Sequence, residues 1–483
     1  MRRRIAHGLI RSMEDEQQSE MTQGTDEQVE ALAEAGSPDL DPAPEAAAAE
    51  EVAQDIQAEE TQIEETADTV EALESMAMVV RQASLEGGLN RTSAALVRNQ
   101  MAYHQKRLGA SRRVPMPSME SFGGVSSRLS ATNVTMEGIK DLAKTAWDAI
   151  VKAMRRVISF FQEYYNKFFG GAERLKARAE KLAKVTVEGK LDEKSGDDTG
   201  LASRLHMSKV TSFAKLKEGL ETVKKLVDAS QGASKTVTDK IETFCDNDAE
   251  TVTKETLTAL NTEVNGAMKL NGSLTEANGS SLNDVKGSDA SAKVFASTEI
   301  PGGNVLYVRE SGSTGGLSRA SGISLTPLDS KATATKVEWL AGPNNNDIAN
   351  MVAGIAGALV FNKSGTEKAQ KVREKIAKFA ERAAKVSSNE SYAFSFEADG
   401  DTGDTTDGTT TAAANQTSNT NTAATTGTAT KDPNALAGAG LRSAINNLKD
   451  CVGKPFDTVA KEALAIGTAA LNLVDKSIRL HSK

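Results

Sequence analysis

The sequence predicts a mainly α protein: a helical bundle with a small antiparallel β insertion, a disordered acidic leader and a low-complexity spacer before the C-terminal helices. Two observations carry this prediction. Residues 139–169 place thirteen apolar side chains on one half of a helical cylinder, which is far wider than a coiled-coil seam. Short runs rich in β-branched residues, separated by turn residues, lie between about 300 and 342 and indicate strands.

The first 120 residues are set apart by their charge. Residues 11–80 contain 21 acids and one base, whereas residues 81–483 sum to +8. Residues 14–70 have few large apolar side chains, so we expect disorder there, with a transient solvated helix at most over residues 46–73. A basic amphipathic helix is expected near residues 93–108. An extended, exposed linker that contains Arg112, Arg113, Pro115 and Pro117 follows it.

Residues 121–396 are predicted to form a mainly helical core domain. The helix over residues 139–169 is expected to end at Gly170-Gly171 and to form a hairpin with a second helix over 172–185. Further amphipathic stretches predict helices at 208–230, 233–244, 251–269, 346–361 and 366–386. Strands are expected at 304–308, 323–327 and 335–340.

The end of the chain divides into a spacer and a helical segment. Residues 397–433 are rich in Thr, Ala, Asn and Gly, a composition typical of a flexible spacer. Residues 434–483 are predicted to supply two C-terminal helices, 436–452 and 456–480, that pack on the core.

Motifs for catalysis, metal binding and membrane crossing are not evident. The two cysteines and four histidines are scattered, no phosphate-binding glycine loop is found, and no run of 18 apolar residues exists. We therefore expect no enzyme, no cofactor and no stable membrane span. The Trp, Tyr, Phe, Lys and Arg content of residues 139–169 leaves open a second interpretation, a membrane-interface or effector module. A third is a helical structural or secreted protein without processing.

A tripeptide of small hydroxyl residue, large apolar residue and Glu recurs along the chain. It ends at Glu14, Glu86, Glu120, Glu137 and Glu397. Most copies lie in segments predicted to be flexible or at domain edges, where an extended and accessible backbone permits proteolysis. Such tripeptides also arise by chance in a chain rich in Ser and Glu, and Thr135 can instead act as a helix N-cap.

The order of motifs between residues 94 and 138 is more specific. Arg107-Leu108-Gly109 is followed by Val114-Pro115, by Met119-Glu120-Ser121-Phe122-Gly123 and by Met136-Glu137-Gly138, and an aromatic helix closed by Phe169-Gly170-Gly171 comes next. This arrangement resembles the processing region of internal head (inner-core) proteins of large tailed bacteriophages. The resemblance is close over residues 75–185 and does not include the spacer.

The resemblance implies a structural virion protein that is built into the prohead, in the host cytoplasm, with residues 1–120 as a propeptide. The prohead protease and other head proteins would be its partners. The main cleavage would follow Glu120, with Ser118, Met119 and Ser121 as recognition positions, and Glu14, Glu86, Glu137 and Glu397 are lesser candidates. Pro117 departs from the family pattern and restricts Met116 to extended geometry.

Charge agrees with packaging beside DNA. The whole chain carries −9, whereas residues 121–483 carry +3. We expect at most weak, salt-sensitive and sequence-independent DNA contact. The candidate contacts are the basic residues Lys144, Lys152, Arg155, Arg156, Arg174, Lys176 and Arg178.

Overall fold

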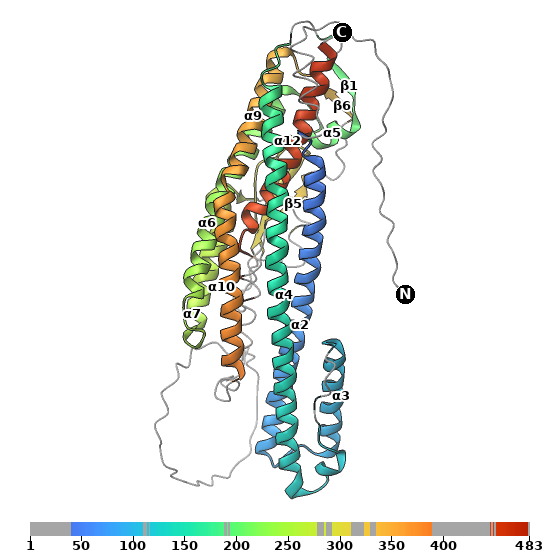
Figure 1. Cartoon of the computed structure of the whole chain (residues 1–483), viewed down its shortest axis with the longest axis vertical. Helices are drawn as coiled ribbons and strands as arrows, with labels where there is room; N and C mark the ends of the chain where they lie inside the picture. Colours follow the sequence, from blue (N-terminus) through green and yellow to red (C-terminus); the bar gives the residue numbers. More distant parts are fainter. Residues whose placement is uncertain are drawn as a thin grey trace, which may run out of the picture.

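The computed structural model describes residues 40–109, 116–187, 194–277, 292–310, 323–328, 335–388 and 451–481, with single residues 114, 191, 285, 445 and 448. The molecule is an elongated rod whose long helices run along its axis (Figure 1). It is mainly α with a small antiparallel sheet, as the sequence predicts. The predicted spacer over 397–433 and most of the predicted helix over 436–452 lie outside the described residues.

Helix α4 (Val125–Leu182) is the axis of the rod and is a single helix of 58 residues. The predicted hairpin at Gly170-Gly171 is therefore wrong. Phe168, Phe169 and Ala172 on either side of the two glycines are buried in the main core, and a glycine inside a helix costs only about 1 kcal/mol relative to alanine. Burial of the flanking aromatic side chains outweighs that cost, so the helix continues.

Helix α2 (Ala43–Leu85) shows that the prediction of disorder over residues 14–70 is wrong from Ala43 onward. It runs beside α4 for most of its length (Figure 1). Its buried side chains repeat at heptad spacing, with Ile56, Ile63 and Val70 seven residues apart. Such a narrow seam needs few apolar residues, which is why the composition of this segment suggested disorder.

Three tertiary contacts define an antiparallel register between α2 and α4. Glu45 pairs with Arg174 at 3.0 Å, Glu59 pairs with Arg156 at 2.9 Å, and the Ser84 hydroxyl donates to the Asn133 side chain at 3.2 Å. Exposed ion pairs contribute about 0–1 kcal/mol each, whereas a fully buried Val, Ile or Leu contributes about 1.5–3 kcal/mol. The apolar seam therefore holds α2 in place, and the polar contacts fix its register.

The remaining helices complete the bundle. Helix α3 is Arg91–Arg107, α5 is Thr199–Leu205, α6 is Phe213–Cys245, α7 is Lys254–Met268, α9 is Gly342–Phe361, α10 is Lys363–Ser388 and α12 is Lys454–His481. Short 3-10 helices are η2 (Met119–Phe122), η3 (Ala249–Thr251) and η4 (Leu270–Gly272). The two helices predicted at 208–230 and 233–244 are one helix, α6, because Ser230 and Ala233 at the expected break are both fully buried. The helices predicted at 93–108, 251–269, 346–361, 366–386 and 456–480 are present with shifted ends.

The β insertion is larger than predicted and is divided in two. Strands β2 (Thr275–Glu276), β3 (Lys293–Ala296), β4 (Asn304–Glu310) and β5 (Ser324–Pro327) form an antiparallel sheet in that order. Strand β6 (Lys336–Glu338) pairs instead with β1 (Ser195–Asp197). The Gly/Asn/Ser-rich composition of residues 270–300 gave no strand signal for β2 and β3. Strand β3 pairs with β4 and β2 pairs with β3, so both depend on tertiary pairing more than on their own propensity.

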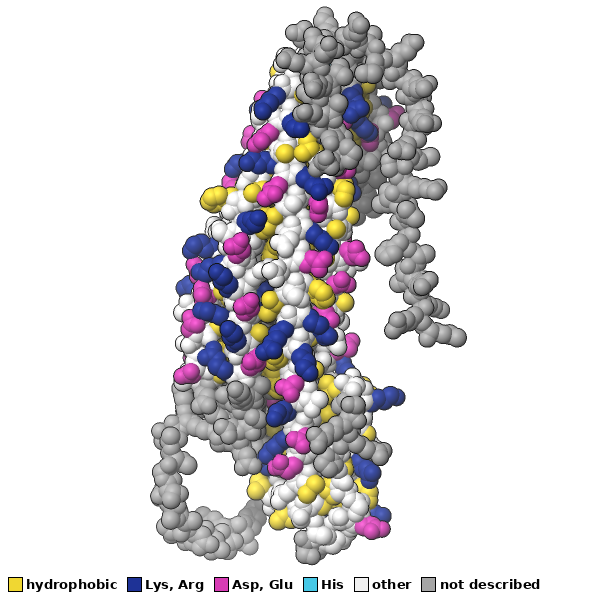
Figure 2. Space-filling model, in the orientation of Figure 1, with side chains coloured by type: hydrophobic (Ala, Val, Ile, Leu, Met, Phe, Trp, Pro, Cys, Tyr) yellow, Lys and Arg dark blue, Asp and Glu magenta, His cyan; other side chains and the backbone are white. Residues whose placement is uncertain are grey.

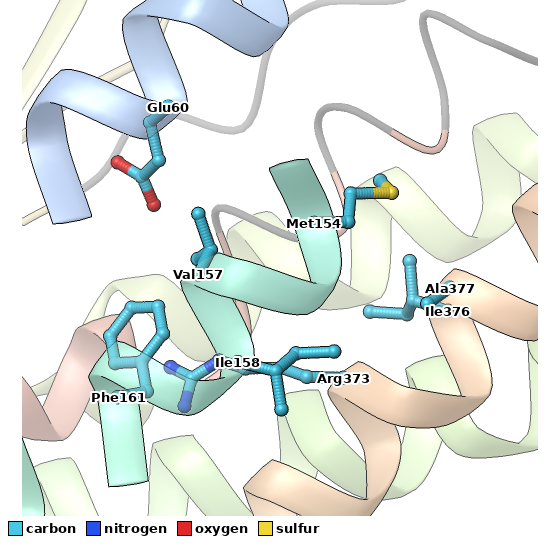
Figure 3. A pocket seen from close by; sticks show the side chains of 8 residues that line it. All are labelled: Glu60, Met154, Val157, Ile158, Phe161, Arg373, Ile376 and Ala377. Carbon is cyan, nitrogen blue, oxygen red and sulfur yellow. The ribbon is translucent and has the colours of Figure 1, made fainter. Parts of the chain in front are cut away.

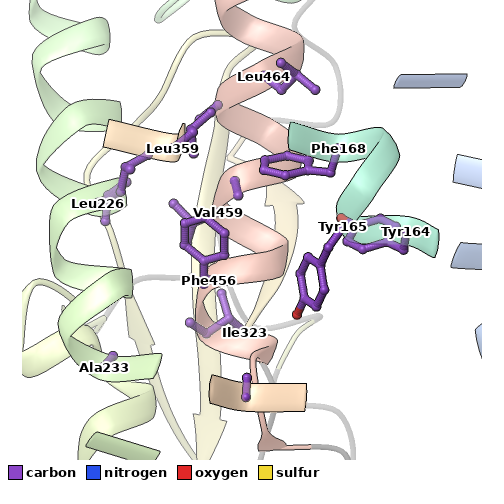
Figure 4. Close-up of a cluster of buried hydrophobic side chains, with 14 of the residues drawn as sticks. Tyr164, Tyr165, Phe168, Leu226, Ala233, Ile323, Leu359, Phe456, Val459 and Leu464 are labelled. Carbon is purple, nitrogen blue, oxygen red and sulfur yellow. The ribbon is translucent and has the colours of Figure 1, made fainter. Parts of the chain in front are cut away.

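The main core lies where α4, α6, α9 and α12 meet. Phe168 of α4 packs edge-to-face on Phe456 of α12, with ring centroids 6.2 Å apart. Figure 4 shows Leu226 of α6 and Leu359 of α9 pointing into the same layer. The aromatic face of α4 is thus covered by helices that are distant in sequence.

Candidate processing site and basic face

A second, smaller hydrophobic cluster lies at the end of the rod where α2 meets α3. We call it the end cluster. Its buried members are Leu73, Met76, Val80, Leu89, Ala94, Val97, Met101, Phe122, Ala131, Ile139 and Leu142. Residues from both sides of position 120 therefore share one small core, and the predicted processing site is part of a folded unit.

Glu120 lies in η2, between the leader and the start of α4. The Gly123 amide donates to the Glu120 carbonyl at 3.0 Å, and the Ser127 hydroxyl donates to the Ser121 carbonyl at 2.8 Å. The Glu120 side chain is exposed, but Phe122 two residues later is only 2% exposed. The peptide bond after Glu120, which is the predicted cleavage site, thus follows an exposed acidic side chain and lies in a hydrogen-bonded turn.

The recognition positions around Glu120 differ in exposure. Ser118 is exposed and is the N-cap of η2, whereas Met119 is partly buried against the end cluster. Val114 and Met116 pack against the same cluster, so the prediction of an exposed linker is wrong for these two residues. A protease that binds its substrate as an extended strand must first open η2.

Glu86 has the most exposed surroundings among the described candidates. It is the C-cap residue of α2, and the preceding Leu85 is 77% exposed. Gly87 and Gly88 follow with φ angles of +94° and +100°, which form the turn into α3. The side chains of Leu85 and Glu86 are thus exposed at the end of α2, and Glu86 stays a candidate for a second cleavage site.

Glu137 is the least accessible described candidate because it lies inside α4. Thr135 is 1% exposed and its hydroxyl donates to the Ala131 carbonyl at 2.9 Å, so it is not an N-cap. Cleavage there would require α4 to unwind. Glu14 and Glu397 lie outside the described residues, as do Arg112, Arg113 and Pro115.

The seven candidate DNA-contact residues do not form one free basic surface. Lys144 and Lys152 are exposed on α4. Arg155 pairs with Glu381, and Lys176 pairs with Glu180 at 3.8 Å. Arg178 is 8% exposed and donates to the Asn472 side chain at 2.9 Å, and this burial removes it from the candidate contacts.

Arg156 and Arg174 both form ion pairs with acidic residues of the leader. Their partners are Glu59 and Glu45 of α2. On the face shown in Figure 2, Lys and Arg side chains are interspersed with Asp and Glu along the rod rather than gathered in one patch. The described side chains on this face therefore form no extended basic patch of the kind that binds a polyanion tightly.

The described residues contain no group of three or more potential metal ligands. Cys245 and Cys451 are both buried, and burial raises the pKa of Cys245 to about 12, which removes a reactive thiolate at neutral pH. The pocket in Figure 3 lies between α2, α4 and α10 beside Arg373 and Phe161. Its volume of about 20 Å³ has room for a water molecule and not for a substrate.

The membrane-interface interpretation of residues 139–169 is not supported. Trp147, Tyr164 and Phe168 are 5%, 7% and 2% exposed, so the aromatic face is already covered. Within the described part of the chain, the helices are too short or too polar to cross a membrane.

Comparison with known proteins gives a family match. Residues 26–431 match the family of phiKZ-like phage internal head proteins. Neither the curated proteins nor the solved structures give a match. The family match extends from the acidic leader through α10, and it includes the end cluster and Glu120 but not α12.

Proposed function

Because the chain belongs to the phiKZ-like phage internal head proteins and is thus a structural protein inside the phage head, we propose that it enters the prohead as a precursor and is cut after Glu120. The prohead protease would make this cut while the head matures. Assembly takes place in the host cytoplasm, where the chain meets the other head proteins.

The position of Glu120 carries this proposal. It is an exposed acid two residues after the exposed Ser118, at the junction between the leader helices and the long helix α4. Glu137, which has the same tripeptide pattern, is inside an unbroken helix. A protease that reads both sequence and accessibility would therefore distinguish these two sites.

We further propose weak and sequence-independent contact with the packaged DNA. Lys144 and Lys152 are exposed on α4, and the segment after Glu120 carries +3. So small a charge neutralises few phosphates, and the contact should weaken steeply as salt rises. Retention on DNA that does not change with salt would contradict this part.

N-terminal sequencing of the protein from mature virions tests the cleavage. A chain that starts at Ser121 is the expected result, and recovery of the full-length chain from Met1 without any chain that starts at Ser121 would defeat the proposal. The variant Glu120→Gln should abolish this start, whereas the matched control Glu137→Gln should leave it unchanged. If the main wild-type chain begins at Gly87 instead, Glu86 is the main cleavage site.

A further inference from the structure

We propose that a cut after Glu120 leaves the leader helix α2 bound to α4, so that the matured protein is a two-chain assembly held without a covalent link. This inference rests on the proposed cleavage. The binding site is the face of α4 that α2 covers, and its ligand is an acidic helix with an apolar heptad seam.

The first argument is that α2 belongs to the main core rather than to the surface. Val52, Ile56, Ile63 and Val70 are 4%, 6%, 0% and 0% exposed and are members of the main hydrophobic cluster. A cut at position 120 removes none of these contacts, because all of them lie far from the scissile bond. Burial of apolar surface drives association between chains as it does within one chain.

The second argument is the length over which the two helices match. The polar contacts of Glu45, Glu59 and Ser84 with α4 fall in one antiparallel register from the start of α2 to its end. In addition, Lys461 of α12 pairs with Glu50. The leader therefore binds along its whole helix and not at one anchor point.

The third argument is that the turn after α2 is also fastened to α4. The Leu89 amide donates to the buried Thr132 hydroxyl at 2.8 Å. Gly88, with φ of +100°, lies so close to Arg128 that an added Cβ would be 2.9 Å from its backbone carbonyl carbon. Both ends of α2 thus have specific contacts that survive a cut after Glu120.

Retention has a consequence for charge. While α2 stays in place, Glu59 and Glu45 continue to occupy Arg156 and Arg174. Cutting alone therefore does not expose these arginines. The cut protein is expected to bind DNA as weakly as the uncut protein does.

The test uses the full chain with a recognition sequence for a sequence-specific protease inserted between residues 109 and 114. After cutting in vitro, both fragments should co-elute in equal amounts from a size-exclusion column in native buffer and separate only in denaturant. Separate elution in native buffer would overturn the inference. Amide hydrogen exchange gives a second readout without any substitution in α2: this helix should stay as protected after the cut as before it, and a loss of protection would count against retention.

Matched variants identify the surface. Val70→Asp places a charge at a position that is 0% exposed, and the cut leader should then dissociate at least tenfold faster. Val79→Asp, at a position of the same helix that is 61% exposed, should retain the leader like the wild type. Circular dichroism of the uncut variants checks that both still fold. Equal retention by the two variants would contradict the proposed seam.

The engineered cut does not depend on the prohead protease. If mature virions contain no chain that begins at Ser121, the proposed cleavage fails, and the engineered cut still decides whether the leader is retained. If the virion protein begins at Ser121 and the engineered fragments separate, the cleavage stands and the retention fails.

Discussion

The side chain of Asp457 joins three helices through polar contacts inside the rod. The Tyr165 hydroxyl of α4 donates to the Asp457 carboxylate of α12 at 2.8 Å, and the Arg373 guanidinium of α10 lies 3.8 Å from the same carboxylate. Arg373 also lies over the Phe161 ring at 3.5 Å and donates to the Val452 carbonyl. Sequence alone gave no reason to single out these residues, because they are about 80 to 290 residues apart in the chain.

Stability should depend on the ionisation of Asp457. Burial raises the pKa of Asp457 from 3.8 to about 6, although Arg373 and the hydrogen bond from Tyr165 act in the opposite direction. The native state therefore holds this proton more tightly than the unfolded state, and the resulting stability is complete below pH 4 and is lost as the pH rises through 6.

Asp457→Asn removes this titration. Relative to the wild type, the variant should become more stable between pH 4 and pH 7 by at most about 3 kcal/mol, since one pKa unit corresponds to about 1.4 kcal/mol. Urea unfolding of both proteins across this range measures the difference. A constant difference between the two proteins at every pH would contradict the prediction.

Two helical glycines should respond oppositely to alanine. An added Cβ at Gly171 of α4 would lie 3.5 Å from Glu45, an ordinary contact, whereas at Gly467 of α12 it would lie 2.9 Å from Leu175. Gly171→Ala should stabilise the protein by about 0.5–1 kcal/mol through helix propensity. Gly467→Ala should destabilise it by about 1–3 kcal/mol through overpacking. Thermal unfolding measures both effects. A loss of stability in Gly171→Ala would contradict the expectation that residue 171 lies inside a continuous helix.

At the scale of elements, sequence reasoning succeeded where a helix has a wide apolar face and failed where the face is narrow. Residues 139–169 were found because half of that cylinder is apolar. Helix α2 was predicted to be disordered because its buried seam contains at most about one large apolar residue per turn. Two positions of that seam are polar, Glu59 and Thr66, which weakens the apolar pattern further. The seven-residue spacing of Ile56, Ile63 and Val70 was the available signal.

The end cluster should control how fast Glu120 is cut. Phe122 is 2% exposed, and its replacement by alanine removes a buried ring at a typical cost of about 3–5 kcal/mol. If η2 opens before cleavage, Phe122→Ala should increase the rate at which a glutamyl-specific protease cuts after Glu120 by tenfold or more. Leu129→Ala, at a position 43% exposed, is the control and should leave the rate unchanged.

The time course of limited proteolysis, read by mass spectrometry, separates the two sites. Cutting after Glu86 should be equally fast in the wild type and in Phe122→Ala, because the turn at Gly87 is exposed in both. Equal rates at Glu120 in the two proteins would show that η2 does not protect this bond.

At the scale of the whole molecule, the charge asymmetry of the sequence has a different meaning in the folded protein. Acidity over residues 11–80 suggested a disordered segment that repels itself. From Ala43 onward these acidic residues instead lie on helix α2, which packs on the basic helix α4. Their ion pairs with Arg156 and Arg174 offset the repulsion between the acidic side chains. A composition count cannot show this, because it does not say which acid faces which base.

The shared core also predicts how a chain without its leader behaves. If residues 121–483 are produced alone, the face of α4 that α2 covers is exposed to water, and the end cluster loses its members from α2 and α3. We expect this chain to aggregate or to unfold at a temperature lower by at least ten degrees than the same residues obtained by cutting the full chain, since several large apolar side chains lose their burial. Circular dichroism melting and size-exclusion chromatography of the two preparations make the comparison. Identical melting and a monomeric leaderless chain would show that α2 is dispensable for the fold.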